Sequence, residues 1–179
     1  MLQQMGLDFV NSPANIAEDL SVSASPQELA QAIALQKAQQ VARGLNEGLV
    51  IAADTVVAYA GKVMGKPANR EKAYSMLAYL SGQCHQVITG LCVLDVMDNI
   101  PDTAVECTDV FFRSISPVEI NNYLDHGEWW DKAGSYGIQG RGALLVDHIE
   151  GCFYNVVGLP LNRLNLMLRK KGLDLLEVK

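Results

Sequence analysis

The sequence predicts an α/β fold built on a mixed sheet, because helical and strand-like patterns alternate along its 179 residues. Segments that carry a capping residue and apolar residues at helical spacing alternate with short apolar runs typical of buried strands. Several of those runs are separated by a short turn, which indicates antiparallel hairpins in addition to parallel pairs. No repeat, low-complexity tract or flexible linker interrupts the chain, so we expect one domain over residues 1–179.

The first half of the chain should hold two complete helices and three short strands. Met1 to Gly6 resembles the end of a helix that Gly6 closes. Ser25-Pro-Gln-Glu28 is a capping box that opens a helix reaching about Arg43. Leu49–Ala53 is an apolar run typical of a buried strand, and we expect this strand to end before Asp54. The other expected elements are strands at Val56–Tyr59 and Lys62–Met64 and a helix that Asn69 caps and that runs to about Leu80.

The second half should hold two long strands, a hairpin and two helices. Ser116-Pro-Val-Glu119 is a second capping box, and it predicts a helix to about His126. Four glycines in Asp131–Gly142 predict a loop. The final helix should begin at Pro160 and end near Lys171, where basic residues suit its C-terminal dipole. The strands are expected at His85–Val96 and Thr103–Arg113, with a hairpin of Ala143–Ile149 and Phe153–Val157.

Composition excludes several classes of function. Apolar residues form 49% of the chain and charged residues 19%, which is ordinary for a globular protein. The net charge of −6 argues against a nucleic-acid surface, although a few local cations can still serve a small anionic ligand. No apolar run is long enough to cross a membrane and no export signal opens the chain. The four cysteines form no metal-binding pattern, so we expect reduced thiols in a cytoplasmic protein.

A few residues are candidates for chemistry. Asp54 follows a buried strand, where an aspartate can hold Mg²⁺ or activate a water, but it is also a common turn residue. Lys66, in the rigid turn Gly65-Lys-Pro67, can neutralise a phosphate or simply be solvated. Lys37 lies in an otherwise uncharged helical stretch and faces either a cleft or solvent. Glu18 is either a second carboxylate for a cation or a solvated side chain.

The loop from Asp131 to Gly140 is the most unusual stretch of the sequence. Its glycines allow backbone N–H groups to approach an anion, although they also suit an ordinary turn. Gln139 can read a base edge with its amide, or serve the loop alone. His85 is expected to be a hydrogen-bonded structural histidine. No covalent nucleophile is evident, so the residues favour metal-assisted attack of water on a phosphoryl group.

Taken together, these segments resemble the Maf family of nucleoside triphosphate pyrophosphatases. The matching pieces follow the family order and spacing over about residues 6 to 168: Ala53-Asp-Thr-Val-Val57, Gly65-Lys-Pro67, Ser81-Gly-Gln-Cys-His-Gln-Val-Ile-Thr-Gly90, Asp131-Lys-Ala-Gly-Ser-Tyr-Gly-Ile-Gln-Gly140 and Asn155-Val-Val-Gly-Leu-Pro160. The resemblance implies a twisted mixed sheet with flanking helices and two lobes around a cleft, as in inosine triphosphatases. It also implies hydrolysis of a nucleoside triphosphate to the monophosphate and pyrophosphate with a divalent metal, Mg²⁺ or Mn²⁺.

The resemblance also assigns roles to individual residues. The proton-accepting aspartate of the family falls on Asp54, and its metal-side acid falls on Glu18, although the acid that precedes this position is Ala17 here. Thr55 and Gln139 occupy the specificity positions and resemble those of the subgroup that acts on dTTP and UTP. The lysines that face the phosphates correspond to Lys37 and Lys66, and the lysine of the glycine-loop motif corresponds to Lys132, a substrate-binding position. In the proposed reaction Asp54 binds metal, accepts a proton from water, or does both.

One family segment is missing from this sequence. Family members open with a strand and an S-x-S-P-R-R-like loop that brings two arginines to the phosphates, whereas Met1 aligns with a helical residue after that motif. Either the natural protein is longer by roughly 15 residues, or the chain is truncated and impaired. The first reading predicts a dTTP/UTP pyrophosphatase. The second predicts a nucleotide-binding regulator linked to septum formation. The family also suggests a homodimer.

Overall fold

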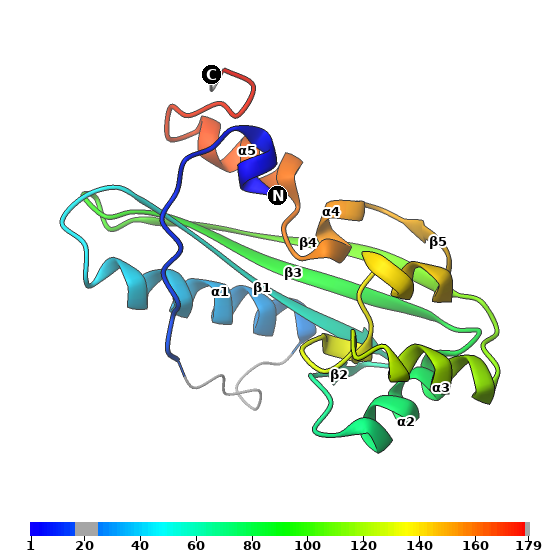
Figure 1. Cartoon of the computed structure of the whole chain (residues 1–179). Helices are drawn as coiled ribbons and strands as arrows, with labels where there is room; N and C mark the ends of the chain where they lie inside the picture. The colour runs from blue at the N-terminus through cyan, green and yellow to red at the C-terminus, as the bar shows by residue number, and fades with distance from the viewer. Residues whose placement is uncertain (17–24, 178–179) are drawn as a thin grey trace. The chain divides into compact units, whose positions relative to one another are not determined.

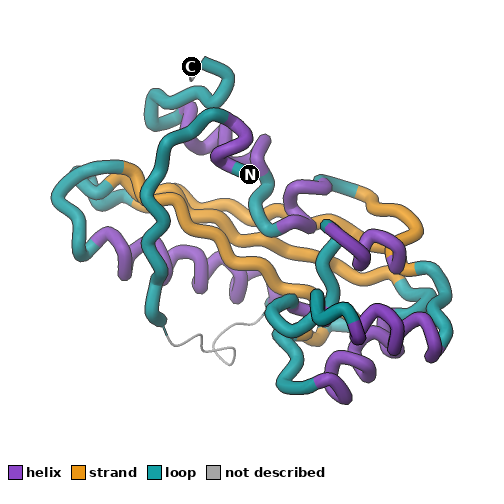
Figure 2. The backbone as a smooth tube through the Cα atoms, in the orientation of Figure 1, coloured by secondary structure: helices purple, strands orange, loops and turns teal. Residues whose placement is uncertain are grey.

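A five-stranded sheet in the order β2-β1-β3-β4-β5 organises the computed structural model, which describes residues 1–16 and 25–177 (Figure 1). β1 and β2 pair antiparallel with Val57 opposite Met64, and β4 and β5 pair antiparallel with Val110 opposite Ile149. Helices and strands alternate along the chain (Figure 2), which confirms the predicted α/β class with flanking helices. The strands are β1 (Leu49–Tyr59), β2 (Lys62–Met64), β3 (Cys84–Asp95), β4 (Pro101–Phe112) and β5 (Val146–Glu150).

The three helices with a predicted capping residue begin where the sequence predicts them to begin. Ser25 Oγ accepts the backbone N–H of Glu28 at 3.2 Å, and Asn69 Oδ1 accepts that of Lys72 at 2.8 Å. A complete capping box joins Ser116 to the third residue of the following helix. The helices are α1 (Pro26–Ala42), α2 (Arg70–Leu80), α3 (Pro117–Asp125), α4 (Phe153–Val157) and α5 (Leu161–Arg169), with short 3-10 turns at Leu2–Met5, Ala133–Ser135 and Gly140–Leu145.

β1 is a single continuous strand, so the predicted strand end before Asp54 is wrong. The strand runs through Leu49–Tyr59 and places Asp54 near its middle. A carboxylate inside a strand needs a partner, because burial penalises an isolated charge. The ammonium of Lys37 lies 2.6 Å from Asp54 and provides that partner.

The predicted hairpin of residues 143–149 and 153–157 is also wrong. β5 pairs with β4 instead, and Phe153–Val157 forms the short helix α4. The carbonyl of Cys152 accepts the backbone N–H of Asn155 at 3.1 Å, while the side chain of Asn155 donates to Thr108 Oγ1 at 2.9 Å. These contacts hold a helical turn where the apolar sequence alone suggested a strand.

The chain divides into two compact units. The first comprises Met1–Asp54, Thr89–Glu106 and Gly158–Lys179, and the second comprises Thr55–Ile88 and Cys107–Val157. In the first unit, alternate side chains of β3 point to opposite faces of the strand and join different clusters. Leu91 and Val93 pack with buried residues of α5, whereas Cys92 and Leu94 pack with buried residues of α1.

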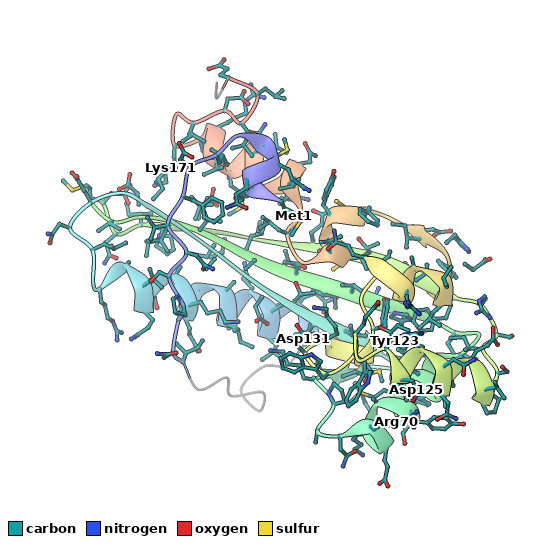
Figure 3. All side chains as sticks on the ribbon, viewed as in Figure 1. Met1, Arg70, Tyr123, Asp125, Asp131 and Lys171 are labelled. Atoms are coloured by element: carbon teal, nitrogen blue, oxygen red, sulfur yellow. The ribbon has the colours of Figure 1, made fainter. Side chains whose placement is uncertain are left out.

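The second unit has one apolar core shared by α2, α3, the strands and the glycine-rich loop. Its buried members include Leu77, Val87 and Tyr136. An ion pair joins α2 to α3 at the surface, because Arg70 Nη2 lies 2.6 Å from Asp125 Oδ1 (Figure 3). Burial of about a dozen such side chains, at roughly 1.5–3 kcal/mol each before chain entropy is subtracted, holds this unit together.

Two further expectations concern the cysteines and the membrane. Cys84, Cys92 and Cys152 are free thiols, in line with the expected reduced chain. Burial raises the pKa of the Cys92 thiol to about 11, so this cysteine packs as a protonated apolar group. Among residues 1–16 and 25–177, no helix has the length and apolar character needed to cross a bilayer.

Candidate active site

Lys37 and Asp54 form an ion pair inside the first unit. Lys37 projects from α1 and Asp54 from β1, with 2.6 Å between Nζ and Oδ1. The lysine side chain is 23% exposed and the aspartate 11%, so the pair is half-buried but reachable from solvent. The sequence left open whether Lys37 faces a cleft or solvent, and the structure turns it toward the carboxylate.

The position of Lys37 follows from the apolar stripe of α1. Buried side chains of this helix include Ile33 and Ala34, and Lys37 lies four and three residues after them. Residues at these spacings share one helix face, so Lys37 continues the face that packs on the sheet. Its alkyl chain can stay in apolar surroundings while the ammonium reaches a polar partner.

A cavity of about 590 Å³ lies beside Lys37 within the same unit. Its volume falls in the range of small-molecule sites, about 300–1,000 Å³. The walls are mainly apolar and come from the stretch 9–14, from the end of α1 and from the first half of β1. The residues that line it include Phe9, Ser12, Lys37, Val50 and Ala53. Lys37 is therefore both a lining residue of this cavity and the partner of Asp54.

The second unit holds the other predicted lysines. Lys66 and Lys132 are both exposed. The turn that contains Lys66 and the glycine-rich loop that contains Lys132 are joined by a hydrogen bond, because the N–H of Gly134 donates to the carbonyl of Gly65 at 3.2 Å. Lys132 forms an ion pair of 3.0 Å with Asp131, the residue that opens this loop (Figure 3). The two lysines thus belong to segments that are fixed to each other.

Gly134 has a structural task that the sequence did not reveal. Its φ of 67° is left-handed, and a Cβ at this position would lie 3.1 Å from the side chain of Val57. Its N–H is already donated to Gly65. Of the two readings that the sequence left open for the loop glycines, Gly134 follows the structural one, because it seats the loop on β1.

Thr55 and Gln139 are the two predicted specificity residues. Thr55 follows Asp54 in β1 and is half-buried. Gln139 is exposed where the loop ends, directly before the 3-10 turn Gly140–Leu145, and its side chain does not cap that turn. Both residues belong to the unit that carries Lys66 and Lys132.

His85 is a residue whose structural role was predicted but whose partner was not. It is buried, and its Nε2 lies 2.7 Å from the hydroxyl of Tyr136 in the glycine-rich loop. Desolvation lowers the pKa of His85 to about 4, so the imidazole is neutral at physiological pH. Burial also raises the pKa of Tyr136. Both groups are neutral, and they are tied by one hydrogen bond that links the start of β3 to the loop.

The metal ligands predicted from the sequence are described only in part. Glu18 lies outside the described residues. Across 1–16 and 25–177, no three His, Cys, Asp or Glu side chains gather in a way that would hold a metal ion. Of the two predicted metal ligands, Glu18 and Asp54, the described residues include Asp54.

Comparison with known proteins decides the family. The family model described as Maf-like protein matches residues 1–171. The chain belongs to the Maf family. The match covers nearly the whole sequence.

Several named relatives are similar to most of this chain. A protein of Syntrophomonas wolfei is 43% identical over 177 residues, which are 99% of this chain and 94% of the relative. A protein of Caldicellulosiruptor bescii is 45% identical over 181 residues, covering 99% and 91%. One from Clostridium perfringens is 49% identical over 141 residues, covering 78% and 73%. All three are named dTTP/UTP pyrophosphatase.

Proposed function

We propose that this protein is a nucleoside triphosphate pyrophosphatase that hydrolyses dTTP and UTP to the monophosphate and pyrophosphate. The half-buried pair of Lys37 and Asp54 carries the proposal on the structural side, since it supplies a carboxylate base and a cation at one point. The names of relatives that are 43% and 45% identical over 99% of the chain support the substrate class.

Asp54 is the residue that accepts a proton from the attacking water. A general base must be ionised to do so, and the ammonium of Lys37 at 2.6 Å stabilises the carboxylate form. The water then attacks the α-phosphorus, and pyrophosphate leaves. Lys66 stabilises the negative charge that spreads onto this leaving group. Once the substrate has bound, Lys37 stabilises the same charge.

Asp54 also fits a divalent metal. Mg²⁺ is commonly held by one or two carboxylates together with the phosphates of the substrate. Asp54, half-buried and close to the chemistry, supplies one such carboxylate, and Glu18 would supply a second. When bound, the cation neutralises charge on the triphosphate. Turnover measured separately with Mg²⁺ and with Mn²⁺ decides which of the two ions the enzyme uses.

Thr55, Lys132 and Gln139 bind the substrate in this proposal. The neutral amide of Gln139 can donate and accept hydrogen bonds, which suits the edge of a pyrimidine base. A glutamate at this position would instead suit a cationic methylated guanine. Lys132 provides a positive charge in the glycine-rich loop, as a triphosphate requires on a protein of net charge −6.

The alternative, a catalytically impaired regulator linked to septum formation, is not favoured. The relatives of this chain are named for an enzymatic activity, and the chain contains the three predicted catalytic residues, Asp54, Lys37 and Lys66. A homodimer and a cytoplasmic location remain predictions that belong to the same proposal.

The test is product analysis with a panel of nucleotides. The purified chain is incubated with dTTP, UTP, dCTP, dATP or GTP and with Mg²⁺ or Mn²⁺, and products are separated by ion-exchange chromatography. We expect monophosphate and pyrophosphate in equal amounts, with dTTP and UTP turned over fastest. Release of orthophosphate would contradict the reaction type, and a preference for purine nucleotides would contradict the substrate class.

A further inference from the structure

A buried cluster of three rings fixes the glycine-rich loop to the sheet of the second unit. His85 is 1% exposed and Tyr136 is 5% exposed, and their polar atoms are 2.7 Å apart. The two rings are perpendicular, with centroids 5.4 Å apart. Phe112 of β4 meets both edge to face, at 4.9 Å from His85 and 4.7 Å from Tyr136. The loop is therefore anchored by one defined arrangement of side chains.

The hydrogen bond has no substitute in this cluster. Nδ1 of His85 is buried and has no hydrogen-bond partner among the described residues, so Nε2 is the polar contact of the ring. Because both side chains are buried, water does not replace a lost partner readily. Loss of either group leaves the other polar atom unsatisfied inside the core.

The loop beside this anchor adopts an uncommon backbone conformation. Ser135 directly precedes Tyr136 and has φ of 67°, a left-handed value that is rare for a residue with a Cβ. Ser135 is fully buried, and its hydroxyl contacts Met76 Sδ at 3.1 Å. Such a conformation persists when neighbouring contacts over-determine it. The bond from Tyr136, the next residue, to His85 is one of these contacts.

The anchor lies between the two ends of the loop that face solvent. Tyr136 is four residues from Lys132 and three from Gln139, both exposed. The side chain of Lys132 passes close to the residue after Tyr136, because a Cβ at Gly137 would lie 3.3 Å from Lys132 Cε. A displaced Tyr136 would carry Gly137 with it and change the path of the lysine.

We propose that His85 is a positioning residue for substrate recognition: its bond to Tyr136 sets the loop so that Lys132 and Gln139 reach the nucleotide. His85 acts through Tyr136 and touches no substrate. The inference rests on the proposed function, because it takes the nucleotide to be the ligand of these two side chains.

Three variants separate this role from simple stabilisation. His85→Phe removes the polar atoms but keeps a ring, Tyr136→Phe removes the hydroxyl, and the double variant removes both. His85→Gln offers a polar amide as a conservative rescue. His148→Phe is the matched control, since His148 belongs to the same unit, is 51% exposed and pairs with its neighbour Asp147.

Steady-state kinetics with dTTP and dCTP measure recognition. We expect His85→Phe and Tyr136→Phe each to raise KM for dTTP about tenfold with kcat within about threefold of the wild type, as loss of one hydrogen bond suggests. The preference for dTTP over dCTP should fall in parallel. The double variant should be no worse than either single one, and His85→Gln should recover part of the loss. Unchanged KM and unchanged preference in His85→Phe would overturn the inference.

Amide hydrogen exchange of residues 131–140 provides a readout that needs no turnover. We expect faster exchange in His85→Phe and Tyr136→Phe and wild-type exchange in His148→Phe. A wild-type protein that hydrolyses no nucleotide would refute the proposed function, and the exchange would still report whether His85 holds the loop. An active wild type whose variants keep both selectivity and loop exchange would refute the inference alone.

Discussion

Gly90 of β3 lies so close to α1 that even one methyl group should destabilise the protein. A Cβ at this position would lie 2.2 Å from the carbonyl oxygen of Ala30 and 2.3 Å from its carbonyl carbon. Ordinary contacts begin near 3.4 Å, so α1 must move by about 1 Å in Gly90→Ala. Over-packing of a core costs about 1–3 kcal/mol, and we expect the upper end because the atoms that are met belong to the helix backbone.

Urea unfolding followed by circular dichroism measures this effect. We expect Gly90→Ala to lower the free energy of unfolding by about 3 kcal/mol, or the melting temperature by roughly 6–12 °C for a chain of this size. Gly44→Ala is the matched control, since a Cβ there would meet only Val41 O at 3.7 Å. A loss below about 0.5 kcal/mol in Gly90→Ala would refute the close packing of α1 on β3.

Three further predictions concern the ion pair and two titrating groups. Lys37→Met should lower kcat about 100-fold while the protein still folds, because it removes a cation from the leaving group; kinetics with dTTP would contradict this if kcat stayed within threefold. Backbone and side-chain hydrogen bonds lower the pKa of Glu119 from 4.5 to about 2, so its stabilisation is complete above pH 4.5 and disappears as the pH falls toward 2. The stability difference between wild type and Glu119→Gln should shrink over that range, and a constant difference would contradict it. Burial lowers the pKa of His85 from 6.5 to about 4, so the unfolded chain binds more protons between these values and stability should decline by up to about 3 kcal/mol as the pH falls from 6.5 to 4. Urea unfolding across this pH range measures the effect, and the decline in the free energy of unfolding should be smaller in His85→Gln. An equal decline in both proteins would count against a buried neutral histidine.

Local signals were the most predictable part of the fold. The caps at Ser25, Asn69 and Ser116 depend on residues three positions apart, and each capped helix begins where the sequence indicates. Gly6 ends the first 3-10 turn with the expected left-handed conformation. These features need no knowledge of the rest of the chain, because the hydrogen bonds close within one turn.

The errors arose where distant residues decide the local structure. Asp54 interrupts an apolar run and so suggested a strand end, but Lys37 of α1 stabilises its carboxylate within a continuous strand. Phe153–Val157 looked like a strand, yet the buried side chain of Asn155 binds Thr108, far away in the sequence, and a helical turn results. Neither pairing has a spacing that periodicity could reveal.

The candidate site was predicted by residue type better than by geometry. Spacing and charge singled out Lys37, Asp54, Lys66 and the glycine-rich loop, while their positions depend on tertiary contacts. Gly134 illustrates the difference, because its lack of a side chain serves the packing against Val57 rather than an anion.

The most direct test of the central claim compares pyrophosphate release by the wild type and by Asp54→Asn with dTTP and Mg²⁺. Loss of the general base should reduce turnover at least about 100-fold, while the far-ultraviolet spectrum stays that of the wild type. Asp98→Asn, which alters an exposed carboxylate paired with Lys171 at 2.9 Å, should keep full activity. Near-normal turnover by folded Asp54→Asn would contradict the assignment of this carboxylate as the base of the reaction.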